Sequence, residues 1–501
     1  MAVGTTIVIA LLTRWFHLAR ECLWFDEGWT WWLVTQPVGS MFRLMSVDTC
    51  APLYFYLLHF WSRLFGEGVF ALRSMSALLA TIALVPWVVL ARRTLVAKGA
   101  FFVAAMLISI SFMQTQYARE ARPYALMGLV TIGALACVPT LAAKRSWPAM
   151  LGFAAGVVAG MYTHNTMAIY AASLAMAWLV WPGERRLKSR AVDLAIVVTI
   201  SIAAFAPWVP TLREQAKWVS GNFWAQTPGP FEWTLVTSAV SGIDVYGVSP
   251  MIWVVLGRSP GAEGVAVLAT IAIALAIASS VSTRDAVARR KAIAIAIVAF
   301  APLVAMFTLS RIGKPMFFPR LFIPTSLLTP LLFAIPIDRT KWVRRVGYAM
   351  AGVMVVGGAT SVVVDLNVMQ KDDWAGAYAY VKQLPPSSKR LLVFVAAEGE
   401  LPYAHRAMLD PTRVQEPRTG SPQGFFALDP PRTMQRVFSE AEVEPLVEKL
   451  KGGAYDEVIL VLSHQGHVDA RGLVVAYFER EWWQAEETKF RNVKLVRYVR
   501  P

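Results

Sequence analysis

Charged side chains are scarce in this chain. Aspartate, glutamate, lysine and arginine make up 16% of its 501 residues, whereas hydrophobic residues make up 56%. Soluble globular domains carry about 25% charged residues. The shortage of charge therefore excludes an ordinary soluble protein and indicates a chain that folds in lipid.

Cysteine is scarcer still. Cys22, Cys50 and Cys137 have none of the spacings of a metal site, and they allow at most one disulfide. Cys22 and Cys50 fall in one segment, where a bridge requires an oxidising compartment and suitable geometry. Cys137 lies within an apolar run, where packing is the expected role.

Two further signals are missing from the sequence. The first apolar run has neither a basic leading region nor a small-residue cleavage site, so we interpret it as a retained membrane span and not as a signal peptide. The polar C-terminal part contains no nucleotide-binding glycine loop. Neither a signal peptide nor a nucleotide-binding loop is therefore expected.

The chain is instead rich in apolar runs long enough to cross about 30 Å of hydrocarbon. Eleven such runs predict a polytopic α-helical membrane protein of about eleven transmembrane helices. They lie near residues 4–20, 69–91, 99–118, 123–143, 147–163, 165–182, 192–211, 263–281, 292–309, 320–337 and 346–366.

The net charge of +15 comes from short basic clusters between these runs and not from the single stripe that binds nucleic acid. Alternate connections carry the clusters, which the positive-inside rule places in the cytoplasm. Residues 21–68, 212–262 and 367–501 then lie outside a cell inner (plasma) membrane. The clusters are Arg92, Arg93 and Lys98; Lys144 and Arg145; Arg185, Arg186, Lys188 and Arg190; Arg284, Arg289, Arg290 and Lys291; and Arg339, Lys341, Arg344 and Arg345.

The organisation along the chain suggests two domains. Residues 1–366 contain the apolar runs, and the two long external loops 21–68 and 212–262 are rich in aromatic residues, which suits helices in the membrane interface. From residue 367 the charge rises and the apolar runs shrink to strand length. We expect residues 367–501 to form an extracytoplasmic α/β domain with strands at 391–396 and 457–462.

Two adjacent carboxylates, Asp26 and Glu27, follow the first expected span and stand among bulky aromatic residues. Two solvated loop acids are the plainer interpretation. A carboxylate pair at the membrane surface is costly to desolvate, however, which favours a functional role. Asp48 follows in the same loop, at the head of an amphipathic Pro-Leu-Tyr segment that contains Tyr54 and His59.

These motifs together resemble the GT-C class of membrane glycosyltransferases, and most closely glycosyltransferase family 39. That branch is related to the protein O-mannosyltransferases and the lipid A aminoarabinose transferases. The resemblance is carried by the acid pair, Asp48, the Pro-Leu-Tyr helix, Leu64-Phe65-Gly66, Gln116 to Leu126 with Arg119-Glu120-Ala121-Arg122-Pro123-Tyr124, Tyr162-Thr163-His164, Phe318-Pro319-Arg320-Leu321 and Lys371-Asp372-Asp373-Trp374.

The resemblance implies an inverting transferase that moves a single hexosyl or pentosyl unit from a polyprenyl-phosphate donor to an acceptor hydroxyl on a glycan, a lipid or a protein. The residues fit this chemistry, because activation of a hydroxyl requires a positioned carboxylate. Asp26 is our first choice and Glu27 the second. The leaving phosphate requires cations, for which Arg119, Arg122, Lys314 and Arg320 are candidates. The further substrate-binding candidates are Asp48, Tyr54, His59, Glu120, Tyr124 and His164.

Some alternatives remain open at this stage. The His, Asp and Glu residues have no spacing that requires a metal, so no cofactor is expected, although Asp26, Glu27 and Asp48 could hold a divalent ion. His59 and His164 could equally be structural residues. A ligase or polymerase of lipid-linked oligosaccharides and a multi-span transporter or flippase are the competing functions. Membrane lipids are partners in each case.

Overall fold

The computed structural model describes residues 2–45, 51–222, 227–244, 261–313, 315–339, 341–368, 371–385, 389–395, 425–427, 455–463, 469 and 471–500. The chain forms two compact units. The helical unit comprises Met1–Leu18, Val38–Trp218 and Ala225–Val368, and the α/β unit comprises Ala19–Pro37, Val219–Trp224 and Met369–Pro501.

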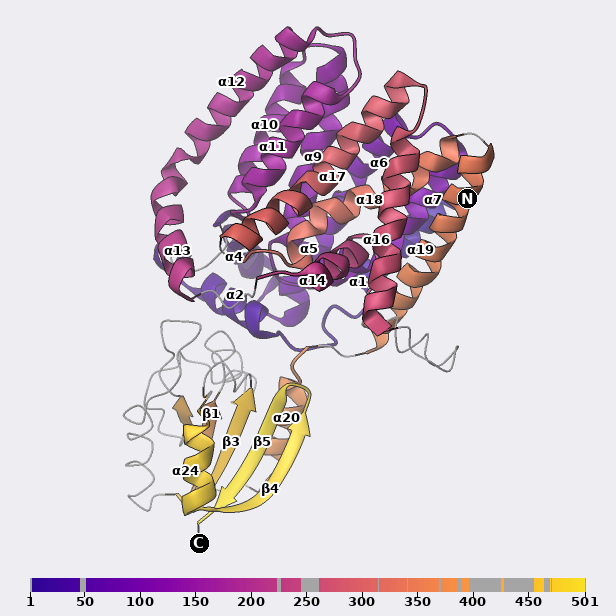
Figure 1. The fold of residues 1–501 in the computed structure, drawn as a ribbon. Helices are drawn as coiled ribbons and strands as arrows, with labels where there is room; N and C mark the ends of the chain where they lie inside the picture. The colour runs from indigo at the N-terminus through magenta and orange to yellow at the C-terminus, as the bar shows by residue number, and fades with distance from the viewer. Residues whose placement is uncertain are drawn as a thin grey trace. The chain divides into compact units, whose positions relative to one another are not determined.

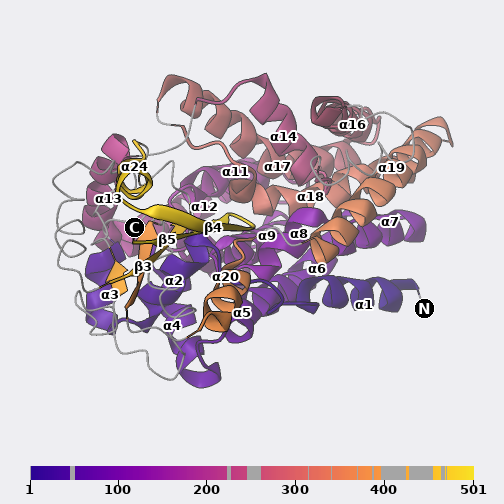
Figure 2. The same ribbon diagram turned by 90° about the horizontal axis from the view of Figure 1, so that it is seen from below.

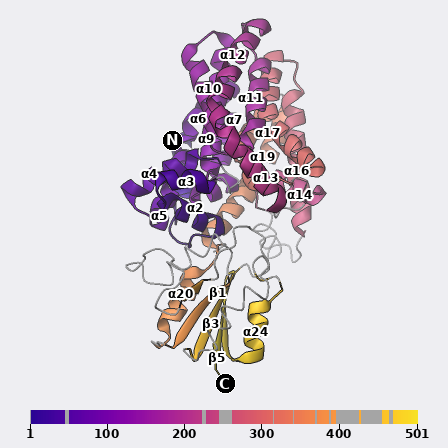
Figure 3. The same cartoon turned by 90° about the vertical axis from the view of Figure 1, so that its left-hand side faces the viewer.

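The helical unit is built from long helices that run side by side, with α9 against α10 and α11 against α17 (Figures 1 and 3). Its helices are α1 (Ala2–Trp15), α3 (Val38–Leu44), α4 (Leu53–Phe65), α5 (Val69–Ile82), α6 (Leu84–Thr94), α7 (Lys98–Ser109), α8 (Phe112–Gln116), α9 (Tyr124–Ala143), α10 (Trp147–Met161), α11 (Met167–Val180), α12 (Leu187–Phe205), α13 (Val209–Asn222), α14 (Pro230–Val240), α16 (Gly261–Val281), α17 (Ala286–Ile312), α18 (Ile323–Ala334) and α19 (Lys341–Asn367).

Within the described residues, 7 helices are long and apolar enough to cross a membrane, or 8 if the bent pair Lys98–Ser109 and Phe112–Arg119 is one span. The chain is thus a multi-pass membrane protein. Three of the expected spans correspond to shorter apolar helices, Thr6–Trp15, Trp147–Met161 and Met167–Val180. Each of the eleven apolar runs therefore coincides with a helix, while a count of eleven full spans stays a prediction.

The segment Pro319–Asp338, which includes α18, lies at the centre of the helical unit, since 94% of its most apolar stretch is buried. Polar side chains in this core bond to backbone carbonyls, because lipid offers no water to satisfy them. Trp87 Nε1 donates to the Leu327 carbonyl at 2.7 Å, and Thr325 Oγ1 donates to the Ala299 carbonyl at 2.7 Å. These bonds fix α6 and α17 against the central helix.

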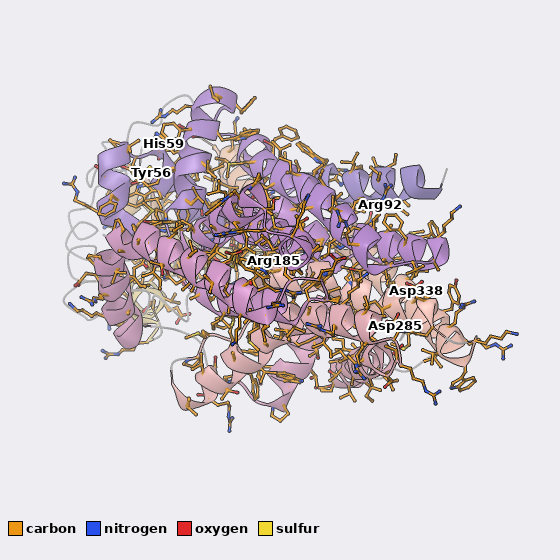
Figure 4. All side chains as sticks on the ribbon, turned by 90° about the horizontal axis from the view of Figure 1, so that it is seen from above. Tyr56, His59, Arg92, Arg185, Asp285 and Asp338 are labelled. Atoms are coloured by element: carbon orange, nitrogen blue, oxygen red, sulfur yellow. The ribbon has the colours of Figure 1, made fainter. Side chains whose placement is uncertain are left out.

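The basic connections meet at one end of the helical unit, where they contact one another. Lys291 Nζ donates to the Arg93 carbonyl at 2.7 Å, and Arg290 Nε donates to the Val180 carbonyl at 2.9 Å. In the view of Figure 4, Arg92 and Asp338 lie on the opposite side of the helical unit from His59 on α4. The alternation of charge along the sequence therefore corresponds to a true alternation of ends in space.

The segment 212–262, which the sequence predicts to be an external loop in the membrane interface, differs in part from that prediction among its described residues. Helix α14 is packed into the core through Val236, Ala239 and Val240. The ring of Trp233 lies parallel to that of Phe317, with centroids 6.0 Å apart. The aromatic pattern at this position reflects packing between helices, which periodicity alone does not distinguish from an interfacial belt.

The α/β unit contains a five-stranded sheet of order β2-β1-β3-β5-β4. Strands β2 (Phe425–Ala427), β1 (Arg390–Val395) and β3 (Glu457–Ser463) are parallel, and β5 (Val493–Val499) is antiparallel to β3 and to β4 (Trp483–Phe490). β1 and β3 confirm the two expected strands, and every residue of β3 is buried, as expected of a strand covered on both faces.

Helices cover both faces of this sheet, as the edge-on view of Figure 2 shows. Helix α24 (Leu473–Glu481) packs through Val474 and Phe478 against Leu391, Val458 and Leu460. Helix α20 (Trp374–Gln383) packs on the other face, where Trp374 meets Ile459 and Val461. The alternation of β3 side chains supplies one core with even-numbered residues and the other with odd-numbered ones.

The contact between α9 and α10 yields a test of the helical packing. A Cβ added at Gly156 would lie 2.9 Å from Ala134 Cβ and from the Val130 carbonyl, whereas one added at Gly133 meets nothing within 4 Å. Both changes to alanine gain about 1 kcal/mol of helix propensity. We therefore expect Gly156→Ala to lower the unfolding temperature of the detergent-solubilised protein, and Gly133→Ala to leave it unchanged or raise it. Equal shifts in both variants would refute this helix contact.

Candidate functional site

The end of the helical unit opposite the basic connections is held together by bonds between distant segments. Arg73 on α5 donates through Nη1 to the Leu18 carbonyl at 2.8 Å, and the Leu53 amide donates to the Tyr162 carbonyl at 2.8 Å. The first bond fixes the exit of α1, and the second joins the start of α4 to the end of α10. This end carries Arg119, Arg122 and Arg320, the described residues among the predicted phosphate ligands.

Arg122, His164 and Arg320 converge at this end from three different connections. Arg122 lies just before α9, His164 lies between α10 and α11, and Arg320 lies in the 3-10 turn Pro319–Phe322 before α18. Arg122 and His164 are buried, and Arg320 is half-buried. Each of the three lies within three residues of the start of a helix, namely α9, α11 or α18. The N–H groups at a helix N-terminus favour a negative ligand.

The pKa of His164 shows that the three residues lie close together. Burial, together with the positive charges of Arg122 and Arg320, lowers the pKa of His164 to about 3. The Thr166 amide donates to Nδ1 at 3.3 Å, so the neutral ring carries its proton on Nε2. His164 thus adds a neutral hydrogen-bond donor beside two guanidinium groups and no third positive charge.

Aromatic rings support both arginines. The guanidinium carbon of Arg122 lies 6.0 Å from the ring centroid of Phe55 on α4, and that of Arg320 lies 5.6 Å from the centroid of Phe318. Such cation–π contacts hold a guanidinium plane without consuming its donors. We call Arg122, His164 and Arg320 the cationic cluster.

Arg119 is arranged differently from the cationic cluster. Its Nη1 atom forms a buried ion pair with Asp365 Oδ2 at 2.7 Å, near the end of α19. The side chains of both residues are more than nine-tenths buried. A guanidinium neutralised in this way is better suited to fixing α19 against the 3-10 turn Tyr117–Arg119 than to binding phosphate.

The other predicted residues of the helical unit are mostly packed. The Tyr54 hydroxyl lies 2.7 Å from Ser76 Oγ, joining α4 to α5. The Tyr124 ring meets Tyr117 edge to face at 5.2 Å. His59 and Glu120 are buried. Asp48, Lys314 and Cys50 lie outside the described residues, so their predicted roles and the Cys22–Cys50 bridge stay predictions.

The acid pair belongs to the α/β unit, at the start of helix α2 (Phe25–Thr35). The two carboxylates differ sharply in exposure. Asp26 is half-buried, whereas the Glu27 side chain is 0% exposed and pairs with Lys371 Nζ at 3.2 Å. Asp26 is therefore the more exposed of the two acids, and its role as base stays a prediction.

Two partners in these contacts carried no role in the sequence interpretation, Asp365 and Lys371. Asp365 had a detectable signal, because an acid inside an apolar run requires a partner. Lys371 stood in a recognised motif, but its contact with Glu27 spans 344 positions of sequence, which no local pattern reveals. Among the described residues, no group of three or more His, Cys, Asp or Glu could hold a metal ion.

The neutrality of His164 is open to measurement. With nitrogen-15-labelled histidine in detergent, we expect the His164 signal, assigned by its loss in His164→Gln, to keep the shift of a neutral ring at pH 5. The exposed His17, assigned in the same way, provides the comparison. Because the pKa of His164 is lower in the folded state than in the unfolded state, the neutral ring contributes to the free energy of unfolding. That contribution is fully present above about pH 6.5 and is lost as the pH falls toward 3. Protonation of His164 near neutral pH would contradict the cluster geometry.

Comparison with known proteins gives one family match and a consistent fold. Residues 49–210 match the sequence family described as dolichyl-phosphate-mannose-protein mannosyltransferase. No curated protein sequence matches the chain significantly.

Solved structures align over nearly the whole chain. ArnT from Cupriavidus metallidurans in the apo state has 14% identity and a TM-score of 0.56, covering 99% of this chain and 97% of that one. ArnT bound to undecaprenyl phosphate has 13% identity and a TM-score of 0.53, with the same coverage of 99% and 97%. A mutant of the arabinofuranosyltransferase AftD from Mycobacteria has 13% identity and a TM-score of 0.50, covering 99% of this chain and 41% of that one.

These identities are too low to transfer an activity, but the similarity of fold extends from one end of the chain to the other. The family match covers the segment from α4 to the start of α13, which includes Arg122 and His164. The chain has the GT-C fold of membrane glycosyltransferases, which confirms the resemblance predicted from its motifs.

Proposed function

We propose that this protein is an inverting glycosyltransferase that moves a single sugar from a polyprenyl-phosphate donor to an acceptor hydroxyl. The observation that carries the proposal is the cationic cluster, in which Arg122, His164 and Arg320 gather at the N-termini of α9, α11 and α18. Two guanidinium groups, a neutral donor and three helix N-termini form an environment for one phosphate group.

The cluster suits a leaving group that gains charge. As the bond from the sugar to the lipid phosphate breaks, negative charge develops on the phosphate oxygen, and fixed donors stabilise it without reorganisation. Arg122 and Arg320 supply charge and paired N–H groups, and His164 supplies Nε2–H. A neutral imidazole fits this role because a third cation beside two arginines would be repelled.

Asp26 is the proposed base that accepts the proton of the acceptor hydroxyl. Asp26 is half-buried on the first turn of α2, whereas Glu27 is buried against Lys371. One base and one leaving phosphate on opposite faces of the sugar imply a single displacement with inversion, by the logic of inverting glycosidases.

The relatives support the choice of donor. A solved ArnT structure is described as bound to undecaprenyl phosphate, and the matched family is named for dolichyl-phosphate-mannose. We place the reaction on the extracytoplasmic face, where nucleotide sugars are absent and a lipid carrier supplies the activated sugar. No metal is needed in this scheme, since the cluster itself balances the phosphate charge.

The central experiment follows transfer from polyprenyl-phosphate hexose and pentose donors by mass spectrometry of the product. We expect an increment of a single sugar with the wild-type protein and a loss of at least about a hundredfold in rate with Asp26→Asn, because general-base catalysis contributes this much. The variant Asp456→Asn, at an exposed acid of the α/β unit, serves as the control. An increment of several sugars would instead favour an oligosaccharide ligase or polymerase.

The cationic cluster has its own test in binding of undecaprenyl phosphate. Loss of a charge-assisted bond in Arg122→Ala or Arg320→Ala should weaken binding about ten- to a hundredfold. The control Arg63→Ala removes an exposed arginine of α4 and should leave binding unchanged.

A substitution at Arg119 distinguishes a structural role from phosphate binding. Arg119→Ala leaves Asp365 buried without its cation, so we expect it to destabilise the folded protein by about 3–5 kcal/mol. Wild-type affinity for undecaprenyl phosphate in both Arg122→Ala and Arg320→Ala would contradict the assignment of the cluster.

A further inference from the structure

A lysine of the C-terminal domain contacts the acid pair. Lys371 Nζ pairs with Glu27 Oε2 at 3.2 Å, and the Lys371 amide donates to Glu21 Oε1 at 3.2 Å. The Glu27 side chain is fully buried, and that of Lys371 is 13% exposed. Lys371 thus binds two acids, Glu21 just before α2 and Glu27 in its first turn.

Lys371 is itself fixed by the sheet of the α/β unit. The Asp373 amide donates to the Arg491 carbonyl at 2.9 Å, and Asn492 Nδ2 donates to Asp372 Oδ1 at 2.9 Å. Arg491 and Asn492 form the turn between β4 and β5, where Asn492 adopts a left-handed conformation with φ of 55°. The residues that follow Lys371 are therefore anchored to a rigid hairpin.

The next residues strengthen this anchor. Asp373 caps α20, since its Oδ1 accepts the Gly376 amide at 2.8 Å. Trp374 is 0% exposed in the core between α20 and the sheet, and Cys22 packs against the same core. Segment 21–27 is consequently held on the α/β unit by apolar contact as well as by the Lys371 bonds.

This arrangement restricts the rotation of α2. Adjacent helical residues differ by about 100° around the axis, so fixing Glu27 also fixes the direction of the neighbouring Asp26. A buried ion pair resists displacement because breaking it leaves an uncompensated charge. By fixing Glu27, Lys371 therefore also fixes the direction of Asp26, the residue that precedes it.

We propose that Lys371 is a positioning residue for the transfer reaction, which aligns Asp26 through its ion pair with Glu27. The inference rests on the proposed function, and it assigns the C-terminal domain a part in building the catalytic site in addition to any contact with acceptor. The domain is then required for turnover even with the smallest acceptor.

The test measures steady-state transfer from polyprenyl-phosphate sugars by full-length variants in detergent. For Lys371→Met we expect kcat to fall about ten- to a hundredfold, while the KM for the lipid donor changes less than about twofold, because the base is misaligned and the phosphate site is intact. Lys371→Arg keeps the charge and should restore at least a third of wild-type kcat. Lys389→Met removes a lysine of the exposed pair with Asp456 and should have no effect.

A double-mutant comparison identifies the route of action. If Lys371 acts through Glu27, then Glu27→Gln combined with Lys371→Met should be no slower than the slower of the two single variants. Additive losses in kcat would overturn the proposal, as would a folded Lys371→Met with wild-type kcat. Should Lys371→Met fail to fold, Lys371→Arg decides, because an inactive but folded arginine variant also overturns it.

Failure of this inference is distinct from failure of the proposed function. Asp26→Asn that retains wild-type transfer removes the base assignment and with it the role of Lys371. Loss of transfer in Asp26→Asn with full transfer in Lys371→Met leaves the function intact and removes only the positioning role. Undecaprenyl phosphate binding, which should be equal in Lys371→Met and wild type, shows that the helical unit is undamaged.

Discussion

The cost of removing charge from water is the constraint on which the rest of this structure depends. A buried arginine or glutamate is tolerated only with a partner, a ligand or a helix terminus that balances its charge. The chain meets this condition in different ways at its buried ionic sites. Arg119 has Asp365, Glu27 has Lys371, and the cationic cluster contains a histidine that burial and the two arginines keep neutral.

These solutions divide the charged residues by role. The paired groups fix elements to one another: Arg119 fixes α19, and Lys371 fixes the segment that carries the acid pair. Arg122 and Arg320 come from separate connections, and both lie close enough to His164 to lower its pKa. The gathering of two guanidinium groups from separate connections makes them candidates for a phosphate ligand.

Much of the architecture could be predicted from the sequence. Apolar runs indicate helices because an unsatisfied backbone cannot cross lipid, and each of the eleven runs coincides with a helix. The strands β1 and β3 were predictable from short apolar runs with flanking turn signals. The role of α14 was not, since an aromatic-rich segment at a membrane surface and one packed between helices share the same composition.

The sequence by itself determined which residue types are available for the site. It also determined that the basic clusters and the predicted site motifs fall at opposite ends of the helices. Both follow from local motifs and charge bias, which depend only on neighbours along the chain. Tertiary structure decided which of those residues serve together. It paired Arg119 with a residue 246 positions away and Glu27 with one 344 positions away, and it brought His164 beside Arg122 and Arg320. Burial and charge compensation act through space, so these contacts cannot be predicted from the positions of the residues along the chain.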